Sequence, residues 1–140
     1  MSAQFKTYSS NVESVQVEIS PGELIDKITI LEIKEQRIRD KTKLANVRRE
    51  LEALNSVRDA TIGESAELNR LETDLKAINV KLWDIEDEIR DRERDLDFNK
   101  RFIACARAVY KTNDRRADLK YQINEFFGAS ITEEKSYTTY

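Results

Sequence analysis

The sequence predicts an all-α protein: a helical bundle with a long antiparallel coiled-coil-like hairpin and a short extended N-terminal segment. Ala, Glu, Lys, Leu and Arg supply 62 of the 140 residues, near the share of about half that is typical of long helices and coiled coils. The chain has 3 Gly and 1 Pro, and all of them fall between stretches of periodic apolar residues. Within those stretches apolar residues recur every three or four positions, the period of an amphipathic helix.

The length of 140 residues favours one folded domain. We expect a flexible N-terminus over residues 1–14, a helical domain over residues 15–128 and a polar C-terminal tail over residues 129–140. Val15, Val17 and Ile19 alternate with polar residues, which is the period of a strand. A lone strand needs a partner, so we expect this segment to lie over helices or to pair with the same segment of another subunit. The tail, with "EEKSYTTY", is expected to be mobile.

The first helix is predicted to begin at Pro21. Ser20, Pro21 and Glu23 stand at the N-cap, first and third helical positions, as in a capping box with proline where its missing N–H does no harm. The run that begins at Ile28 is rich in β-branched residues and could form a strand. We expect a helix, because the capping residues are the stronger signal.

The apolar residues of this helix do not lie on one face only. A core stripe contains Leu24, Ile28, Leu31 and Ile38, whereas Ile25, Ile30 and Ile33 lie well outside it. A helix that is apolar on several sides must be covered on several sides. In a chain this short, we expect another subunit to supply the second covering.

A second helix is predicted after a break near residues 39–42, with Asp40 or Thr42 as its cap. Without a break, the next apolar stripe would lie on the face opposite Leu24. That stripe consists of Leu44, Val47, Leu51 and Leu54.

The clearest pattern follows Gly63, where apolar residues alternate at spacings of three and four and so predict a coiled-coil seam. They are Leu68, Leu71, Leu75, Ile78, Leu82, Ile85 and Ile89. Arg92 takes the next stripe position. Asp95 and Asp97 are the expected caps of a last long helix that ends at Gly128. A short connection between two long helices makes them antiparallel neighbours, so acids of residues 84–97 should lie near bases of residues 100–111.

The last helix is predicted to carry its apolar residues on one face, comprising Phe98, Phe102, Cys105, Val109, Ile123 and Phe127. On this face Cys105 is expected to be a small buried side chain. Nothing in the sequence supplies a base that would make it a nucleophile.

Composition excludes several classes of function. The net charge of −3 gives no electrostatic argument for nucleic acid or an anionic membrane as a general partner. The absence of His excludes His-based triads and imidazole zinc sites. One cysteine allows no internal disulfide, and neither a leader-like apolar region nor a membrane-spanning stretch is present. We expect a cytoplasmic protein without a cofactor.

Arg116 falls at the centre of the last helix's apolar stripe, with Asn113 and Lys120 nearby on the helical wheel. One interpretation is an anion clamp, because a desolvated guanidinium presents a planar fork to carboxylate or phosphate. The other, which we favour, is a structural arginine paired with an acid of a neighbouring helix. The hairpin geometry makes Asp74 a candidate partner.

Four acids recur at helical spacing in the third segment: Asp84, Asp87, Glu88 and Asp91. Such a face can hold magnesium, as in all-α nucleotide pyrophosphatases. An acidic run on a heptad helix is more often its solvated face, so we expect no metal site. Trp83 beside the seam is either an interface anchor or an ordinary packing residue.

Several blocks resemble, in order, an uncharacterised family of small bacterial and phage proteins, a domain of unknown function. The blocks are "SPGELIDKITILEIK", "KLANVRRELEAL", "LWDIEDEIRDRER", "VYKTNDRRADLKYQIN" and "EEKSY". The resemblance covers Val15 to about Tyr137 and implies no activity, cofactor or catalytic residue. It directs interest to the motif positions Glu23, Asp26, Lys27, Trp83, Asp84, Asn113, Arg115 and Arg116.

The sequence therefore favours a non-enzymatic interaction or assembly protein that works as a homo-oligomer through its helices, with no catalytic residue. The alternative is a small all-α enzyme or a binder of a small anionic ligand. It would be magnesium-dependent and nucleotide pyrophosphatase-like, or mutase-like with Arg116 holding the anion.

Overall fold

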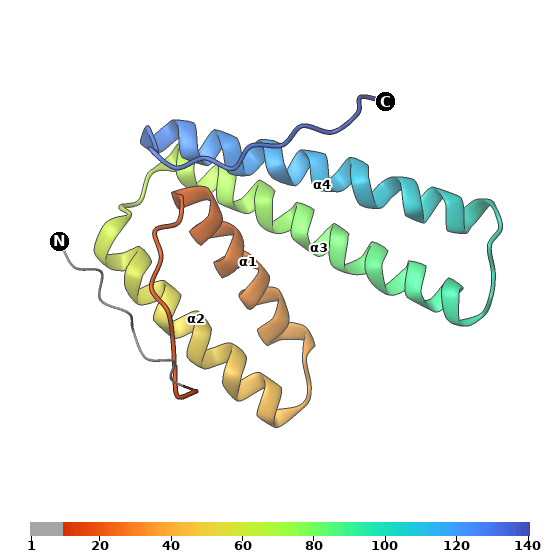
Figure 1. Cartoon of the computed structure of the whole chain (residues 1–140), viewed down its shortest axis with the longest axis horizontal. Helices are drawn as coiled ribbons and strands as arrows, with labels where there is room; N and C mark the ends of the chain where they lie inside the picture. The colour runs from red at the N-terminus through yellow and green to blue at the C-terminus, as the bar shows by residue number, and fades with distance from the viewer. Residues whose placement is uncertain (1–9) are drawn as a thin grey trace, which may run out of the picture.

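The computed structural model describes residues 10–140 and contains four helices in that range, with no β-strand among those residues. They are α1 (Pro21–Arg37), α2 (Lys41–Thr61), α3 (Ala66–Arg94) and α4 (Lys100–Phe127). α3 and α4 form a long antiparallel hairpin, and α1 lies between α2 and that hairpin (Figure 1). The all-α helical bundle is confirmed. Residues 1–9, part of the N-terminus expected to be flexible, lie outside the described residues.

Side-chain caps fix the starts of the first three helices. The Ser20 hydroxyl accepts a hydrogen bond from the Glu23 amide at 3.2 Å, and Asp40 accepts one from the Lys43 amide at 2.8 Å. Ser65 does the same for the Leu68 amide at 3.0 Å. Each bond satisfies an N–H group that has no partner within its helix. The predicted starts at Ser20 and at the break near residues 39–42 are confirmed.

The predicted cap of the last helix was wrong, because Asn99 takes that place instead of Asp95 or Asp97. The Asn99 side chain accepts from the amides of Arg101 and Phe102 at 3.0 and 3.3 Å. Residues 95–97 instead close the preceding helix: the Leu96 amide donates to the Glu93 carbonyl and the Asp97 amide to the Arg92 carbonyl. This is a Schellman closure, with Leu96 in the left-handed region at φ 54°.

Two apolar clusters cover α1 from opposite sides. On one side Leu24, Ile28 and Leu31 pack with Val47 and Leu51 of α2. On the other, Ile25 packs with an apolar group from the long hairpin, which consists of Leu68, Leu71, Leu75 and Ile123. Fully burying one such side chain contributes about 1.5–3 kcal/mol. The expectation that another subunit covers α1 is therefore corrected: α3 and α4 of the same chain do so.

Burial along the predicted seam decreases towards the free end of the hairpin. Leu68, Leu71 and Leu75 are fully buried, whereas Ile89 is only half-buried. α1 packs on one end of α3 and α4, and the other end projects past it (Figure 1). Phe98, predicted on the apolar face of the last helix, precedes the helix and is exposed.

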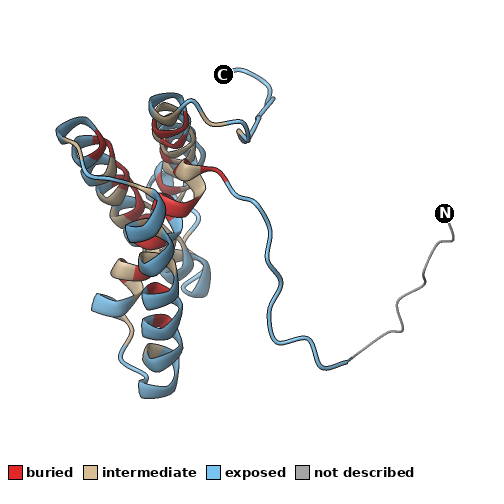
Figure 2. Ribbon diagram, turned by 90° about the vertical axis from the view of Figure 1, so that its left-hand side faces the viewer, coloured by how far each residue is buried: buried red, intermediate tan, exposed pale blue. Residues whose placement is uncertain are grey.

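The segment before α1 has no regular structure in residues 10–19 and extends away from the helices (Figure 2). Val15 and Val17 are exposed, so this segment does not lie over the bundle. Among the helices described here, none is both long and apolar enough to cross a membrane.

Candidate functional site

A buried ion pair joins α1 to α4. Asp26 on α1 is 1% exposed, and its carboxylate accepts from Arg116 twice, from Nε at 3.0 Å and from Nη2 at 2.5 Å. Such a two-point pair fixes both side chains in one orientation. The expected pairing of Arg116 with an acid of a neighbouring helix is confirmed, and the partner is Asp26. Asp74, the partner proposed from the hairpin geometry, instead accepts from Arg70 on its own helix at 3.3 Å.

Lys120, one turn beyond Arg116, is a second buried cation at this junction. Its Nζ lies 2.7 Å from Glu23 Oε2 and 2.9 Å from Glu133 Oε2. Burial alone would lower the pKa of Lys120, but hydrogen bonds to Glu133 and Glu23 outweigh it and raise the pKa. The hydrogen bond to Asp26 likewise raises the pKa of Arg116. Both cations therefore keep their charge over the physiological pH range.

Neutral polar groups complete the network, and the sequence had not singled them out. Asn79 of α3 donates through Nδ2 to Asp26 Oδ1 and to Thr29 Oγ1, each at 2.9 Å. The Gly22 amide donates to Asn124 Oδ1 at 2.7 Å. The available signal was that Asn79 directly follows a seam residue and Asn124 directly follows Ile123 of the last helix's apolar face. At such positions a polar side chain can become buried and then needs partners.

Gly22 allows this junction to form. A Cβ atom there would lie 2.5 Å from the backbone oxygen of Lys120 and 2.9 Å from Asn124 Oδ1. The first turn of α1 thus approaches the backbone of α4 more closely than any residue with a side chain permits. The glycine of the "GELIDK" motif is therefore explained by packing.

Beside the ion pair lies a cleft of about 530 Å³ between α1, α3 and α4. Its apolar wall consists of Ile30, Ile33, Leu82 and Trp83. Its polar lining includes Asn79, Asn113 and Arg116. Three predicted positions therefore line one cleft: Trp83, Asn113 and Arg116. Arg116 is also the ion-pair partner of Asp26. Trp83 also lies under the Arg37 guanidinium, 5.9 Å from the ring centroid.

The remaining predicted positions do not join this site. Lys27 is exposed and 3.9 Å from Glu23 in the adjacent helical turn. Asp84 accepts a hydrogen bond from Arg37. Arg115 is exposed and has no ion pair within residues 10–140.

Arginines contact three of the four acids on the acidic face of α3, and Asp87 has no ion pair within residues 10–140. Glu88 accepts from Arg101 at 2.6 Å and from Arg92 at 3.3 Å, and Asp91 lies 3.2 Å from Arg94. The hydrogen bonds from Arg101 and then Cys105 lower the pKa of Glu88 to about 2. Acids of α3 and bases of α4 do lie near each other across the hairpin, as expected. Throughout the described chain, no three metal-ligating side chains are grouped to hold an ion.

Cys105 is a buried free thiol, as expected. Burial and a hydrogen bond to Glu88 raise its pKa, which favours the unreactive thiol over the nucleophilic thiolate. The groups at the α1–α4 junction are likewise paired with one another. This arrangement can position a ligand, but it offers no activated nucleophile.

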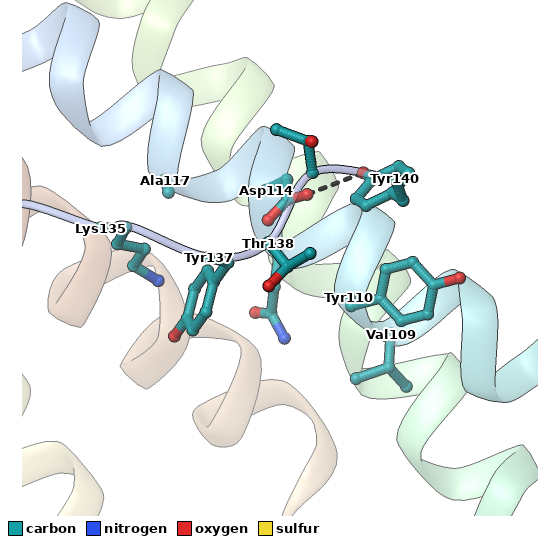
Figure 3. Close-up of a pocket in the computed structure, with 10 residues that line it drawn as sticks. Val109, Tyr110, Asp114, Ala117, Lys135, Tyr137, Thr138 and Tyr140 are labelled. Atoms are coloured by element: carbon teal, nitrogen blue, oxygen red, sulfur yellow. Dashed lines mark hydrogen bonds between the residues drawn. The ribbon is translucent and has the colours of Figure 1, made fainter.

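The C-terminal tail lies along α4 and is held at two points. Glu133 accepts a hydrogen bond from Lys120 Nζ, and the Tyr140 hydroxyl donates one to Asp114 at 2.7 Å. The Tyr140 ring also packs edge-on against Tyr110, with 5.2 Å between centroids. Between these points the tail spans a hollow of about 1000 Å³ (Figure 3). The tail that we expected to be mobile therefore contacts α4 at both ends, and its mobility stays a prediction.

No curated protein and no solved structure matches this chain. A family model does match, and it covers residues 15–140, all but the first fourteen residues. The matched range includes the ion-pair junction, the cleft and the tail. The chain therefore belongs to the family of unknown function DUF6165.

Proposed function

We propose that the protein is a non-enzymatic interaction protein that assembles as a homo-oligomer through the free end of the α3–α4 hairpin. By "hairpin end" we mean residues 91–103. One observation carries the proposal: Leu96, Phe98 and Ile103 of the hairpin end are 73%, 53% and 55% exposed, and the neighbouring Phe102 is half-buried. The rings of Phe98 and Phe102 contact edge-to-face, with centroids 5.1 Å apart.

A second copy of the chain suits this surface because the hairpin end carries no net charge. Four acidic and four basic residues lie between Asp91 and Arg101. Two identical surfaces of this kind do not repel each other, and a two-fold contact can set acids of one copy against bases of the other. Removing the exposed apolar side chains from water would drive the association.

The pairing of Arg116 favours this proposal over the enzyme alternative. A mutase-like anion clamp needs a guanidinium with a free charge, whereas Asp26 already accepts from two of its nitrogens. The arginines that contact Asp84, Glu88 and Asp91 weaken the magnesium alternative in the same way. We place the assembly in the cytoplasm, in keeping with the single unpaired cysteine.

Sedimentation equilibrium over micromolar to millimolar protein tests the proposal. The wild type should associate as concentration rises. Ile103→Glu should weaken association about tenfold or more, because burying a carboxylate in an apolar contact costs more than about 1.4 kcal/mol.

Val57→Glu is the matched control, since Val57 is 50% exposed on α2, away from the hairpin end. It should associate as the wild type does, and circular dichroism should show both variants folded. A wild type that stays monomeric at every concentration would sink the proposal, as would equal weakening by the two variants.

A further inference from the structure

We propose that the C-terminal tail, residues 129–140, is a releasable strap that opens and closes over α4 while the four helices stay folded, with Glu133 as its latch. The proposal does not depend on self-association through the hairpin end. The family model covers the tail through residue 140, so the tail lies within the region that the family shares.

The end of α4 sets the course of the tail. Gly128 adopts the left-handed conformation at φ 62°, and the Ala129 amide donates to the Asn124 carbonyl at 3.0 Å. This helix end turns the chain, and the tail runs back beside α4 (Figure 1). Within residues 10–140, no backbone group beyond Ala129 is hydrogen-bonded to the backbone of the helices. The tail can therefore leave α4 without breaking a backbone hydrogen bond of the bundle.

Two side-chain anchors hold the tail within the described chain, and water reaches both. Glu133 accepts from Lys120 Nζ at 2.9 Å, and its side chain is 46% exposed. The Tyr140 hydroxyl donates to Asp114 (Figure 3), and Tyr140 is 76% exposed. Between the anchors the tail spans the hollow of about 1000 Å³ instead of packing tightly on the helix. Because exposed contacts of this kind stabilise only weakly, the docked tail is close in free energy to the released tail.

Glu133 is the stronger anchor because it carries a charge. The hydrogen bond from Lys120 lowers the pKa of Glu133, so at neutral pH this anchor is a charge-assisted hydrogen bond. Release of the tail leaves Lys120 paired, since its Nζ also lies 2.7 Å from Glu23 of α1. The buried ammonium therefore keeps an acid beside it, and the strap can open while α1 stays in place.

The strap lies over a part of α4 that also reaches the cleft between α1, α3 and α4. Val109 and Asn113 line the hollow on the side of the helix, and Tyr137 lines it on the side of the tail. Asn113 lines the cleft as well. A docked tail therefore limits access to the hollow beside the cleft, and a released tail uncovers Val109 and Asn113.

Backbone amide NMR on the full chain tests the strap. In the wild type, the heteronuclear NOE values of residues 131–140 should lie between those of the helices and those of a free chain end. Glu133→Gln should raise the ratio of released to docked tail about tenfold, because a neutral acceptor replaces a charged one. The NOE values of the tail should then fall to those of a free chain end, and the amide signals of Tyr110 and Asn113 should shift. The melting temperature of the helices should change little.

Glu134→Gln is the matched control, since Glu134 is the next residue of the tail and has no ion pair within residues 10–140. It should leave the NOE values and amide signals as in the wild type. The proposal is overturned if the wild-type tail already has the NOE values of a free chain end, if Glu133→Gln leaves them unchanged, or if Glu134→Gln lowers them as much. It is also overturned if Glu133→Gln lowers the melting temperature of the helices markedly, because the tail would then unfold together with the bundle.

Discussion

Replacing Asp26 with asparagine tests how much the buried ion pair stabilises the bundle. The substitution keeps the shape of the side chain but removes the charge, and it sets a new amide N–H₂ against Arg116. Asp26 is 1% exposed and Arg116 27% exposed. Removing one partner of a buried pair costs about 3–5 kcal/mol. Because water reaches part of the guanidinium, we expect the lower limit, about 3 kcal/mol. That is a large part of a total stability of about 5–15 kcal/mol.

Urea unfolding followed by Trp83 fluorescence measures this loss. With a slope of about 1–3 kcal/mol per molar urea, the midpoint should fall by about 1–3 M. Asp74→Asn is the matched control, because Asp74 bonds Arg70 on an exposed face of one helix, and it should change stability by less than about 0.5 kcal/mol. A loss for Asp26→Asn below about 1 kcal/mol, or equal losses for both variants, would refute the reasoning, since a buried pair must cost more than that.

Three further predictions concern close packing, pH and metal. Gly22→Ala should lower the melting temperature, because the added Cβ would lie 2.5 Å from a backbone oxygen of α4. Gly63→Ala is the control and should not lower it, because nothing lies within 4 Å of a Cβ at Gly63. Similar melting curves for the two variants would contradict the close approach. The folded pKa of Glu88 is about 2 against an ordinary value of 4.5, so the stability that Glu88 contributes is present above pH 4.5 and disappears as pH falls through about 2. Above pH 4.5 the wild type should therefore melt at a higher temperature than Glu88→Gln, and this difference should disappear as the pH falls through about 2. A difference that does not depend on pH would argue against the ion pair. Millimolar magnesium should leave the melting temperature unchanged, because arginines contact three of the four acids on this face of α3, Asp84, Glu88 and Asp91. A clear rise would restore the metal hypothesis.

Local features of the structure could be predicted from the sequence because neighbouring residues determine them. The caps at Ser20 and Asp40 depend on a side chain and an amide three residues later, and both are visible in the printed sequence. The last helix shows the limit of such rules. Asp95 and Asp97 have suitable side chains, but the closure of α3 around Leu96 uses these positions. Leucine gives no sign that it adopts a left-handed conformation.

The candidate site could be predicted only in part, because its partners come from distant segments. The helical wheel placed Arg116 and Asn113 on an inward face, and both do line the cleft. It could not show that α1, rather than α3, supplies the acid for Arg116. That pairing depends on where α1 packs, and Gly22 permits the close approach of α1 to α4. The second apolar side of α1 was misassigned to another subunit for the same reason.

An isotope-filtered NOE experiment on a mixture of labelled and unlabelled protein tests self-association through the hairpin end most directly, because it detects only contacts between copies. We predict intermolecular NOEs from the Leu96 and Ile103 methyl groups to aromatic protons of Phe98 and Phe102, and none from the Val57 methyl groups. Intermolecular NOEs confined to other surfaces, or none at the highest soluble concentration, would contradict the proposed assembly.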